Sequence, residues 1–193
     1  MSTTYKSKIL LKDTIIDGYL TTENGIISYV GESLPFGSYT ELKDVIIAPG
    51  FIDIHCHSSK SSLAKDNPEE VCAFHLSHGT TTMLLSFYRN IPHDELLTCL
   101  DKVKVAMKTC KNLYGAHLEG PYLNANLGTG FSDAENPKPN FDNCYEYIKT
   151  GVVKQWTSAP EIDGVCELIN IISQIKSIVK NKKVFEEKNT KFW

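Results

Sequence analysis

The sequence predicts an α/β protein in which strands and helices alternate along most of the chain. The alternation runs over residues 49–179, where four apolar strands are each followed by a helical pattern. Such alternation is typical of a parallel sheet with helices packed against it. Residues 1–48 instead consist of short strands and turns, which predicts the N-terminal part of a small β domain. Residues 180–193 form a polar tail that continues neither pattern.

The small β segment is expected to contain short strands at residues 8–11, 14–21 and 25–30. The Asn24-Gly25 pair before the last of them is typical of a type I′ hairpin turn, because both residues tolerate positive φ angles. Residues 31–43 are rich in turn-forming residues and are interpreted as a connection. The apolar run of residues 45–54 is interpreted as one strand, which opens the alternating region.

The first helix of the alternating region has local signals at both ends. Asn67 and Pro68 predict its start, because an asparagine N-cap followed by proline at the first helical position is a common arrangement. Gly79 is expected to close this helix. Pro92 is expected to open a second helix. The apolar residues of the second helix that keep helical spacing are Leu96, Leu100, Val103 and Met107.

The later strands are expected at residues 80–88, 113–118 and 152–158. A short third helix is marked by Phe141, Tyr145 and Ile148. A fourth, amphipathic helix carries Val165, Leu168, Ile169, Ile172 and Ile175. Units of this kind fit either an open doubly wound sheet or part of a TIM barrel, since a complete barrel repeats the βα unit about eight times.

Composition and charge exclude several classes of protein. The chain has 193 residues, of which 41% are hydrophobic and 22% charged, as in ordinary globular proteins. The net charge of −3 gives no electrostatic reason to expect a nucleic-acid partner. We expect a cytoplasmic protein without a membrane partner, because neither a bilayer-spanning apolar run nor a signal-peptide core is present. The six cysteines form no C-x-x-C pair and are interpreted as free thiols.

Residues that carry chemistry are expected at the carboxyl ends of the strands in both architectures. His55 and His57 would project from the same side of a strand, with Cys56 turned away. Glu119 follows a neighbouring strand and completes a His/His/Glu set suited to a divalent cation, Zn²⁺ above all, with Fe, Mn or Co as alternatives. The competing interpretation is a histidine pair bonded to the backbone and a carboxylate paired with a basic side chain.

Other polar residues near the strand ends are interpreted structurally. Arg89 is expected to form a structural ion pair, and Glu161 is expected to cap the helix that follows it. His75 and His78 are placed on a helix as surface or core residues, and His93 is expected to be exposed.

Three segments resemble a known family. Residues 48–57, APGFIDIHCH, resemble the first-strand signature of the amidohydrolase superfamily. Residues 117–124, HLEGPYLN, are similar to the third-strand motif of the N-acetylglucosamine-6-phosphate deacetylase family, and residues 159–161 are similar to that family as well. The resemblance covers the chain up to about residue 179. It implies a partial (β/α)8 TIM barrel in which only part of the barrel is present.

The resemblance also implies roles for individual residues. Glu119 would be the carboxylate ligand of the catalytic metal, and His55 and His57 would hold a second metal, as in some members. Thr129 and Gly130 would touch the substrate, and the family has a histidine where this chain has Gly130. The implied reaction hydrolyses N-acetylglucosamine 6-phosphate to glucosamine 6-phosphate and acetate. The implied partner is therefore a small phosphorylated amino sugar.

The family carries further metal ligands and a proton-transferring aspartate at positions that would follow residue 179. We therefore expect a truncated or frame-disrupted chain whose catalysis is incomplete. An open part of a barrel exposes sheet edges, so we also expect low solubility, a homodimer, or both. Two alternatives remain open: a different metal-dependent amidohydrolase, and a non-catalytic remnant that at most binds a metal or a partner chain.

Overall fold

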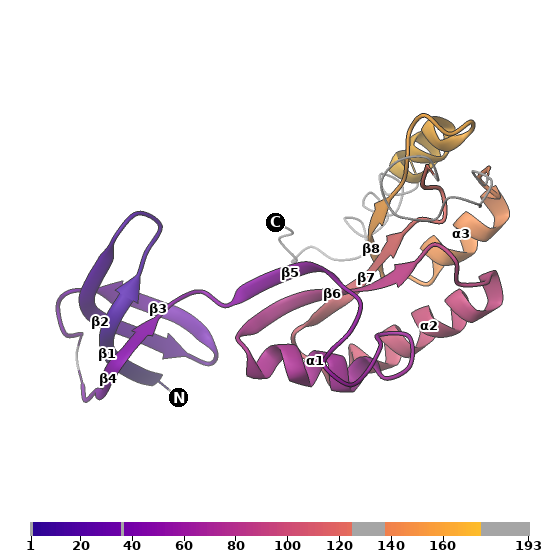
Figure 1. The fold of residues 1–193 in the computed structure, drawn as a ribbon. Coiled ribbons are helices and arrows are strands. Elements are labelled where there is room, and N and C mark those ends of the chain that lie inside the picture. The colour runs from indigo at the N-terminus through magenta and orange to yellow at the C-terminus, as the bar shows by residue number, and fades with distance from the viewer. Residues whose placement is uncertain (1, 36, 125–137, 175–193) are drawn as a thin grey trace. The chain divides into compact units, whose positions relative to one another are not determined.

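The computed structural model describes residues 2–35, 37–124 and 138–174. The chain divides into two compact units, Met1–Gly50 and Phe51–Trp193, which are described separately. Figure 1 shows the first unit as a sheet and the second as strands alternating with helices. No helix among the described residues is both long and apolar enough to span a membrane.

The first unit is a four-stranded sheet in the order β3-β2-β1-β4. Its strands are β1 (Ser2–Leu10), β2 (Ile15–Glu23), β3 (Ile26–Gly31) and β4 (Thr40–Ile47). β1 pairs antiparallel with β2 and parallel with β4, and β2 pairs antiparallel with β3. The turn before β3 is confirmed, since φ is 51° at Asn24 and 81° at Gly25.

The apolar run of residues 45–54 is not one strand, so this prediction is wrong. β4 ends at Ile47 in the sheet of the first unit, and β5 (Phe51–Cys56) begins the sheet of the second unit. Pro49 and Gly50 lie between them, and a proline cannot donate a hydrogen bond to a neighbouring strand. β4 also begins at Thr40, within residues interpreted as a connection, because residues 40–41 pair with β1.

The second unit contains a parallel sheet in the order β5-β6-β7-β8. The strands that follow β5 are β6 (Thr80–Tyr88), β7 (Leu113–Glu119) and β8 (Val153–Thr157). The helices between them are α1 (Pro68–Ser77), α2 (His93–Ala106) and α3 (Phe141–Lys149), and residues 165–174 are helical after β8. α1 packs on β6 and α2 on β7, and Figure 1 shows both helices on the same face of the sheet. The predicted parallel α/β arrangement is confirmed.

The predicted boundaries of the first helix are also confirmed. The side chain of Asn67 accepts a hydrogen bond from the backbone N–H of Glu70 at 3.2 Å, and Pro68 occupies the first helical position. Gly79 follows the helix with φ of +92°, a conformation that favours glycine.

The predicted third helix is present as α3, and neighbouring elements decide which of its faces is buried. Phe141 and Tyr145 are 38% and 55% exposed, whereas Cys144 and Tyr147 are buried. The neighbours of the helix decide this orientation: Cys144 lies 3.2 Å from the hydroxyl of Tyr122, and the hydroxyl of Tyr147 lies 2.9 Å from His93 on α2. Those neighbours are distant in sequence, so local pattern alone does not indicate the buried face.

The core of the second unit lies between the central strands and the helices. Its largest fully buried side chains include Met83, Leu85, Phe87, Leu100 and Leu118. β5 differs from the central strands, since Phe51, Ile52 and Ile54 are 69%, 72% and 53% exposed. β5 stands at the end of the strand order, and this position leaves most of its side chains outside the core.

Candidate metal centre

The carboxyl ends of β5 and β7 bring His55, His57 and Glu119 together. Nε2 of His57 lies 2.9 Å from Oε2 of Glu119, and Nε2 of His55 lies 3.4 Å from the same oxygen. The two Nε2 atoms are 2.9 Å apart. Ligands of a tetrahedral Zn²⁺ ion with bonds of roughly 2.0–2.1 Å lie about 3.4 Å from one another. The three side chains therefore fit a divalent cation in both their chemistry and their spacing.

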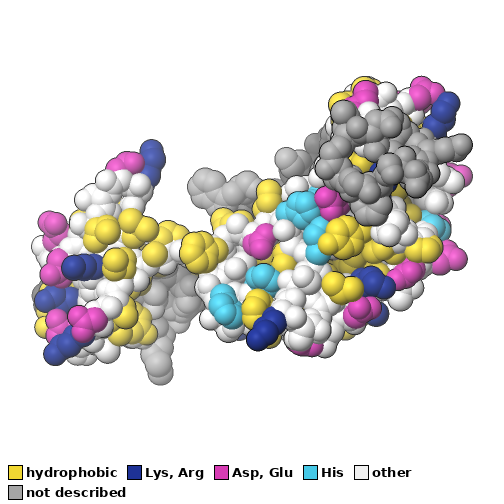
Figure 2. All heavy atoms as spheres, viewed as in Figure 1, with side chains coloured by type: hydrophobic (Ala, Val, Ile, Leu, Met, Phe, Trp, Pro, Cys, Tyr) yellow, Lys and Arg dark blue, Asp and Glu magenta, His cyan; other side chains and the backbone are white. Residues whose placement is uncertain are grey.

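The parallel sheet explains how residues distant in sequence meet at one place. The carboxyl ends of parallel strands lie at one edge of a sheet, where functional groups collect in α/β proteins. The side chain of Asp53 accepts a hydrogen bond from the backbone N–H of His55 at 3.1 Å, which fixes the strand just before the histidines. Figure 2 shows histidine side chains gathered beside a carboxylate on the surface of the second unit.

His57 is held by an aromatic neighbour. Its ring stacks on Tyr88 at the end of β6, with the ring centroids 3.8 Å apart and the planes 5° from parallel. Burial lowers the pKa of His57, while the charge of Glu119 opposes that change. Burial therefore favours the neutral imidazole, which is the form that binds a metal.

His117 lies behind the metal donors and has a separate role. It is fully buried, and its two ring nitrogens form hydrogen bonds with Ser86 Oγ on β6 at 2.9 Å and with Thr157 Oγ1 on β8 at 2.8 Å. Its ring packs edge-on against His55, with the centroids 4.5 Å apart. Burial lowers the pKa of His117 to about 4. His117 thus links three strands behind the donors.

Sequence reasoning missed this role of His117. The available signal was a histidine within an apolar strand, with hydroxyl-bearing residues near the ends of both flanking strands. The hydroxyl groups could be assigned to His117 only after the strand order was known.

The structure confirms the prediction for Cys56 and contradicts those for Glu161 and His93. Cys56 is buried on the side away from the histidine pair, as predicted. Glu161 accepts a hydrogen bond from Asn124 at 2.9 Å, several residues before the helix that begins at residue 165, so the predicted capping role is wrong. His93 is partly buried and bridges α2 to α3 through Glu146 and Tyr147, rather than being exposed.

The predictions for Thr129, Gly130, Arg89 and the two histidines of the first helix remain. Thr129 and Gly130, predicted to touch a substrate, lie outside the described residues. Arg89 lies against Gly120 at the start of that loop: a Cβ atom added to Gly120 would be 2.5 Å from the Cβ of Arg89. His78 is at the surface, and His75 contacts Cys56.

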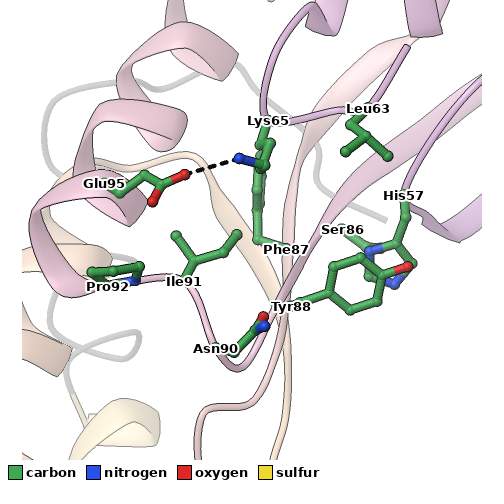
Figure 3. A pocket seen from close by; sticks show the side chains of 10 residues that line it. All are labelled: His57, Leu63, Lys65, Ser86, Phe87, Tyr88, Asn90, Ile91, Pro92 and Glu95. Atoms are coloured by element: carbon green, nitrogen blue, oxygen red, sulfur yellow. Dashed lines mark hydrogen bonds and ion pairs between the residues drawn. The ribbon is translucent and has the colours of Figure 1, made fainter. Parts of the chain in front are cut away.

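A pocket of about 320 Å³ opens beside His57. Figure 3 shows His57 and Tyr88 at one side of it and the ion pair between Lys65 and Glu95, with its 3.1 Å Nζ–Oε1 distance, at the other. Its apolar lining comes from Leu63, Phe87, Ile91 and Pro92. The pocket combines apolar walls with a few polar groups, as small-molecule sites usually do.

Comparison with known proteins places this geometry in context. No family model matches the chain. The chain is 33% identical over 184 residues to an adenine deaminase of Clostridium acetobutylicum, an alignment that covers 93% of this chain and 28% of that protein. It is 30% identical over 172 residues to an adenine deaminase of Ligilactobacillus salivarius, covering 86% of this chain and 25% of that protein.

Solved structures of N-acetylglucosamine-6-phosphate deacetylases superimpose on most of the chain. The enzyme from Mycobacterium smegmatis matches with a TM-score of 0.71 and 23% identity over 88% of this chain and 51% of its own. The enzyme from Pasteurella multocida matches with a TM-score of 0.72 and 16% identity over 90% of this chain and 48% of its own. The chain shares the fold of the covered part of these deacetylases. The resemblance predicted from the sequence is thereby confirmed at the level of the fold.

The similarity extends over only part of the related proteins. The chain spans about half the length of the deacetylase structures and about a quarter of the curated deaminases. The deacetylases and the deaminases are both hydrolytic amidohydrolases, so the two comparisons agree on a class of chemistry and differ in the substrate.

Proposed function

We propose that this chain belongs to a metal-dependent amidohydrolase that cleaves a carbon–nitrogen bond, with His55, His57 and Glu119 as metal ligands. The observation that carries the proposal is the convergence of their donor atoms, 2.9–3.4 Å apart, at the carboxyl edge of a parallel sheet. The fold of the deacetylases and the sequence similarity to the deaminases support the same class of reaction.

We also propose that the βα units form part of a (β/α)8 barrel, with residues 1–48 in a small β domain and residues 49–179 in the barrel. Helices on one face of a parallel sheet support a barrel over a doubly wound sheet, in which helices cover both faces. The deacetylase structures that superimpose on the chain support the same architecture.

The residues in and around the centre would contribute to cation binding in different ways. Glu119 contributes the negative charge, and Tyr88 holds the ring of His57 in one orientation. His117 supports the ring of His55 from behind. A divalent cation bound there would supply Lewis acidity, polarising the bond to be hydrolysed and lowering the pKa of water.

The substrate we favour is N-acetylglucosamine 6-phosphate, which would be deacetylated. Residues 117–124 support this choice, because they are similar to the third-strand motif of that family, and the solved neighbours are deacetylases. Adenine deamination is the second candidate, favoured by the 33% identity to a deaminase over 93% of this chain.

One pair of assays separates the candidates. The full chain, with added Zn²⁺ or with a chelator, would be incubated with N-acetylglucosamine 6-phosphate and, in parallel, with adenine. Zn²⁺-dependent release of acetate from the sugar, without release of ammonia from adenine, would support the deacetylase proposal. Ammonia release alone would favour the deaminase reaction, and neither product in the presence of Zn²⁺ would refute hydrolysis of these two substrates by this chain, in line with incomplete catalysis.

Variants test the role of the centre in any activity found. Glu119→Gln removes the carboxylate charge and is expected to abolish turnover. Glu167→Gln changes an exposed carboxylate on the helix after β8 and is the matched control, expected to keep full activity. Equal activity of both variants would show that Glu119 is not a metal ligand.

A further inference from the structure

A second group of metal-ligating side chains lies beside the candidate centre. Asp53 and Cys56 of β5 and His75 of α1 each offer one donor atom, and these atoms all lie within 4.8 Å of one another. Sγ of Cys56 is 3.1 Å from Nε2 of His75. Cys56 is buried, while Asp53 and His75 are partly buried.

We propose that Asp53, Cys56 and His75 form a second cation site, selective for a borderline-soft divalent metal such as Zn²⁺. Thiolate, imidazole and carboxylate are the three side-chain ligands that Zn²⁺ takes in proteins. In a tetrahedral zinc site, sulfur and nitrogen ligands lie about 3.6 Å apart, so a small outward shift from 3.1 Å admits the ion.

The hydrogen bonds of these side chains show that they already converge. The carbonyl oxygen of Ser58 accepts from Nε2 of His75 at 2.9 Å and from Sγ of Cys56 at 3.5 Å. Nε2 of His75 and Sγ of Cys56 therefore point toward the same oxygen atom. A cation bound between them would replace the two hydrogen atoms. Binding releases the thiol proton to solvent and leaves the imidazole with a single proton on Nδ1. The carbonyl of Ser58 remains beside both atoms as an additional oxygen donor.

The site is separate from the His/His/Glu centre, although both use β5. Successive side chains of a strand point to opposite faces, so Cys56 faces away from His55 and His57. Asp53 joins Cys56 because the pairing of β5 with β6 is irregular between these two residues. No donor atom of the second site is shared with the first.

A cation at the second site would stabilise the position of β5. β5 is at the end of the sheet, and its apolar residues Phe51, Ile52 and Ile54 are largely exposed. A cation held by β5 and by His75 of α1 would tie this strand to the core. The same strand carries His55 and His57, so the second cation would help to position the first site.

Co²⁺ binding to the full chain tests the proposal, because a thiolate ligand gives Co²⁺ a charge-transfer absorption that the His/His/Glu centre cannot give. We expect this band to saturate by two equivalents of Co²⁺ in the unmodified chain, because the His/His/Glu centre also takes the ion, and to disappear in Cys56→Ser. It should weaken in His75→Gln and Asp53→Asn. It should persist in Glu119→Gln, which removes a ligand of the first site, and in Cys166→Ser, which changes an exposed cysteine elsewhere.

Two results would overturn the proposal. One is the absence of a thiolate band at two or more equivalents of Co²⁺ in chain shown to be folded by circular dichroism. The other is an unchanged band in Cys56→Ser, or in both His75→Gln and Asp53→Asn, since binding by a cysteine alone needs neither partner. If Cys56→Ser does not fold, the other two variants decide the question. Failure of this site leaves the first site untouched, because Glu119→Gln and Zn²⁺ stoichiometry report on that site independently.

Discussion

β5 and β7 both end in residues of the candidate metal centre, yet their surroundings differ. β7 lies between β6 and β8, and most of its side chains are buried. β5 is at the end of the strand order, and only Cys56 among its residues is buried. Hydrophobic packing therefore fixes Glu119, whereas polar and aromatic contacts hold His55 and His57. Glu119 is thus positioned by the hydrophobic core, whereas the positions of His55 and His57 depend on local contacts.

Core truncation should show the largest difference between the two strands. Leu118→Ala on β7 removes a fully buried side chain and should lower the free energy of unfolding by about 2–5 kcal/mol. Ile52→Ala on β5 changes a side chain that is 72% exposed and should stay within about 0.5 kcal/mol. Urea unfolding followed by Trp156 fluorescence, in a Trp193→Phe background, measures both. Equal losses would show that β5 is packed as firmly as β7.

The loop that follows β7 gives a smaller effect. Gly120 has φ of +97°, and a Cβ atom there would lie 2.5 Å from the Cβ of Arg89, so Gly120→Ala adds a collision to backbone strain. We expect a loss of about 2–3 kcal/mol. Gly151→Ala is the control, because its φ of +78° is also positive but a Cβ there meets nothing within 4 Å. It should cost only about 1–2 kcal/mol. A larger loss of unfolding free energy in Gly151→Ala than in Gly120→Ala would contradict the tight contact at Arg89.

The aromatic contact on β6 should have the smallest effect. Tyr88→Leu removes the ring that stacks on His57 while keeping an apolar side chain. Stacked aromatic pairs contribute about 0.5–1.5 kcal/mol, so Zn²⁺ affinity should fall roughly two- to tenfold. Calorimetric titration measures this change. Tyr114→Leu, which alters an exposed ring on β7, is the control and should leave Zn²⁺ affinity unchanged.

The sequence predicted the features that depend on neighbouring residues. Asn67, Pro68 and Gly79 define α1 through local backbone chemistry, and the bounds of β6 were predicted to the residue. The proximity of His55 and His57 to Glu119 followed from the rule that functional groups collect at the carboxyl ends of parallel strands.

Features that depend on distant neighbours were not predicted. The division of residues 45–54 between two sheets depends on which strands each half pairs with. The role of His117 depends on hydroxyl groups from two other strands. The contact of Cys56 with His75 depends on where the packing of α1 on β6 places His75, which no local pattern encodes.

Zn²⁺ stoichiometry tests the central claim most directly. In a Cys56→Ser background, which removes the proposed second site, the chain should bind one equivalent of Zn²⁺ by calorimetry. Adding Glu119→Gln should abolish that binding, and adding Glu167→Gln should leave it intact. Undiminished Zn²⁺ binding after Glu119→Gln would contradict the assignment of His55, His57 and Glu119 as a metal centre.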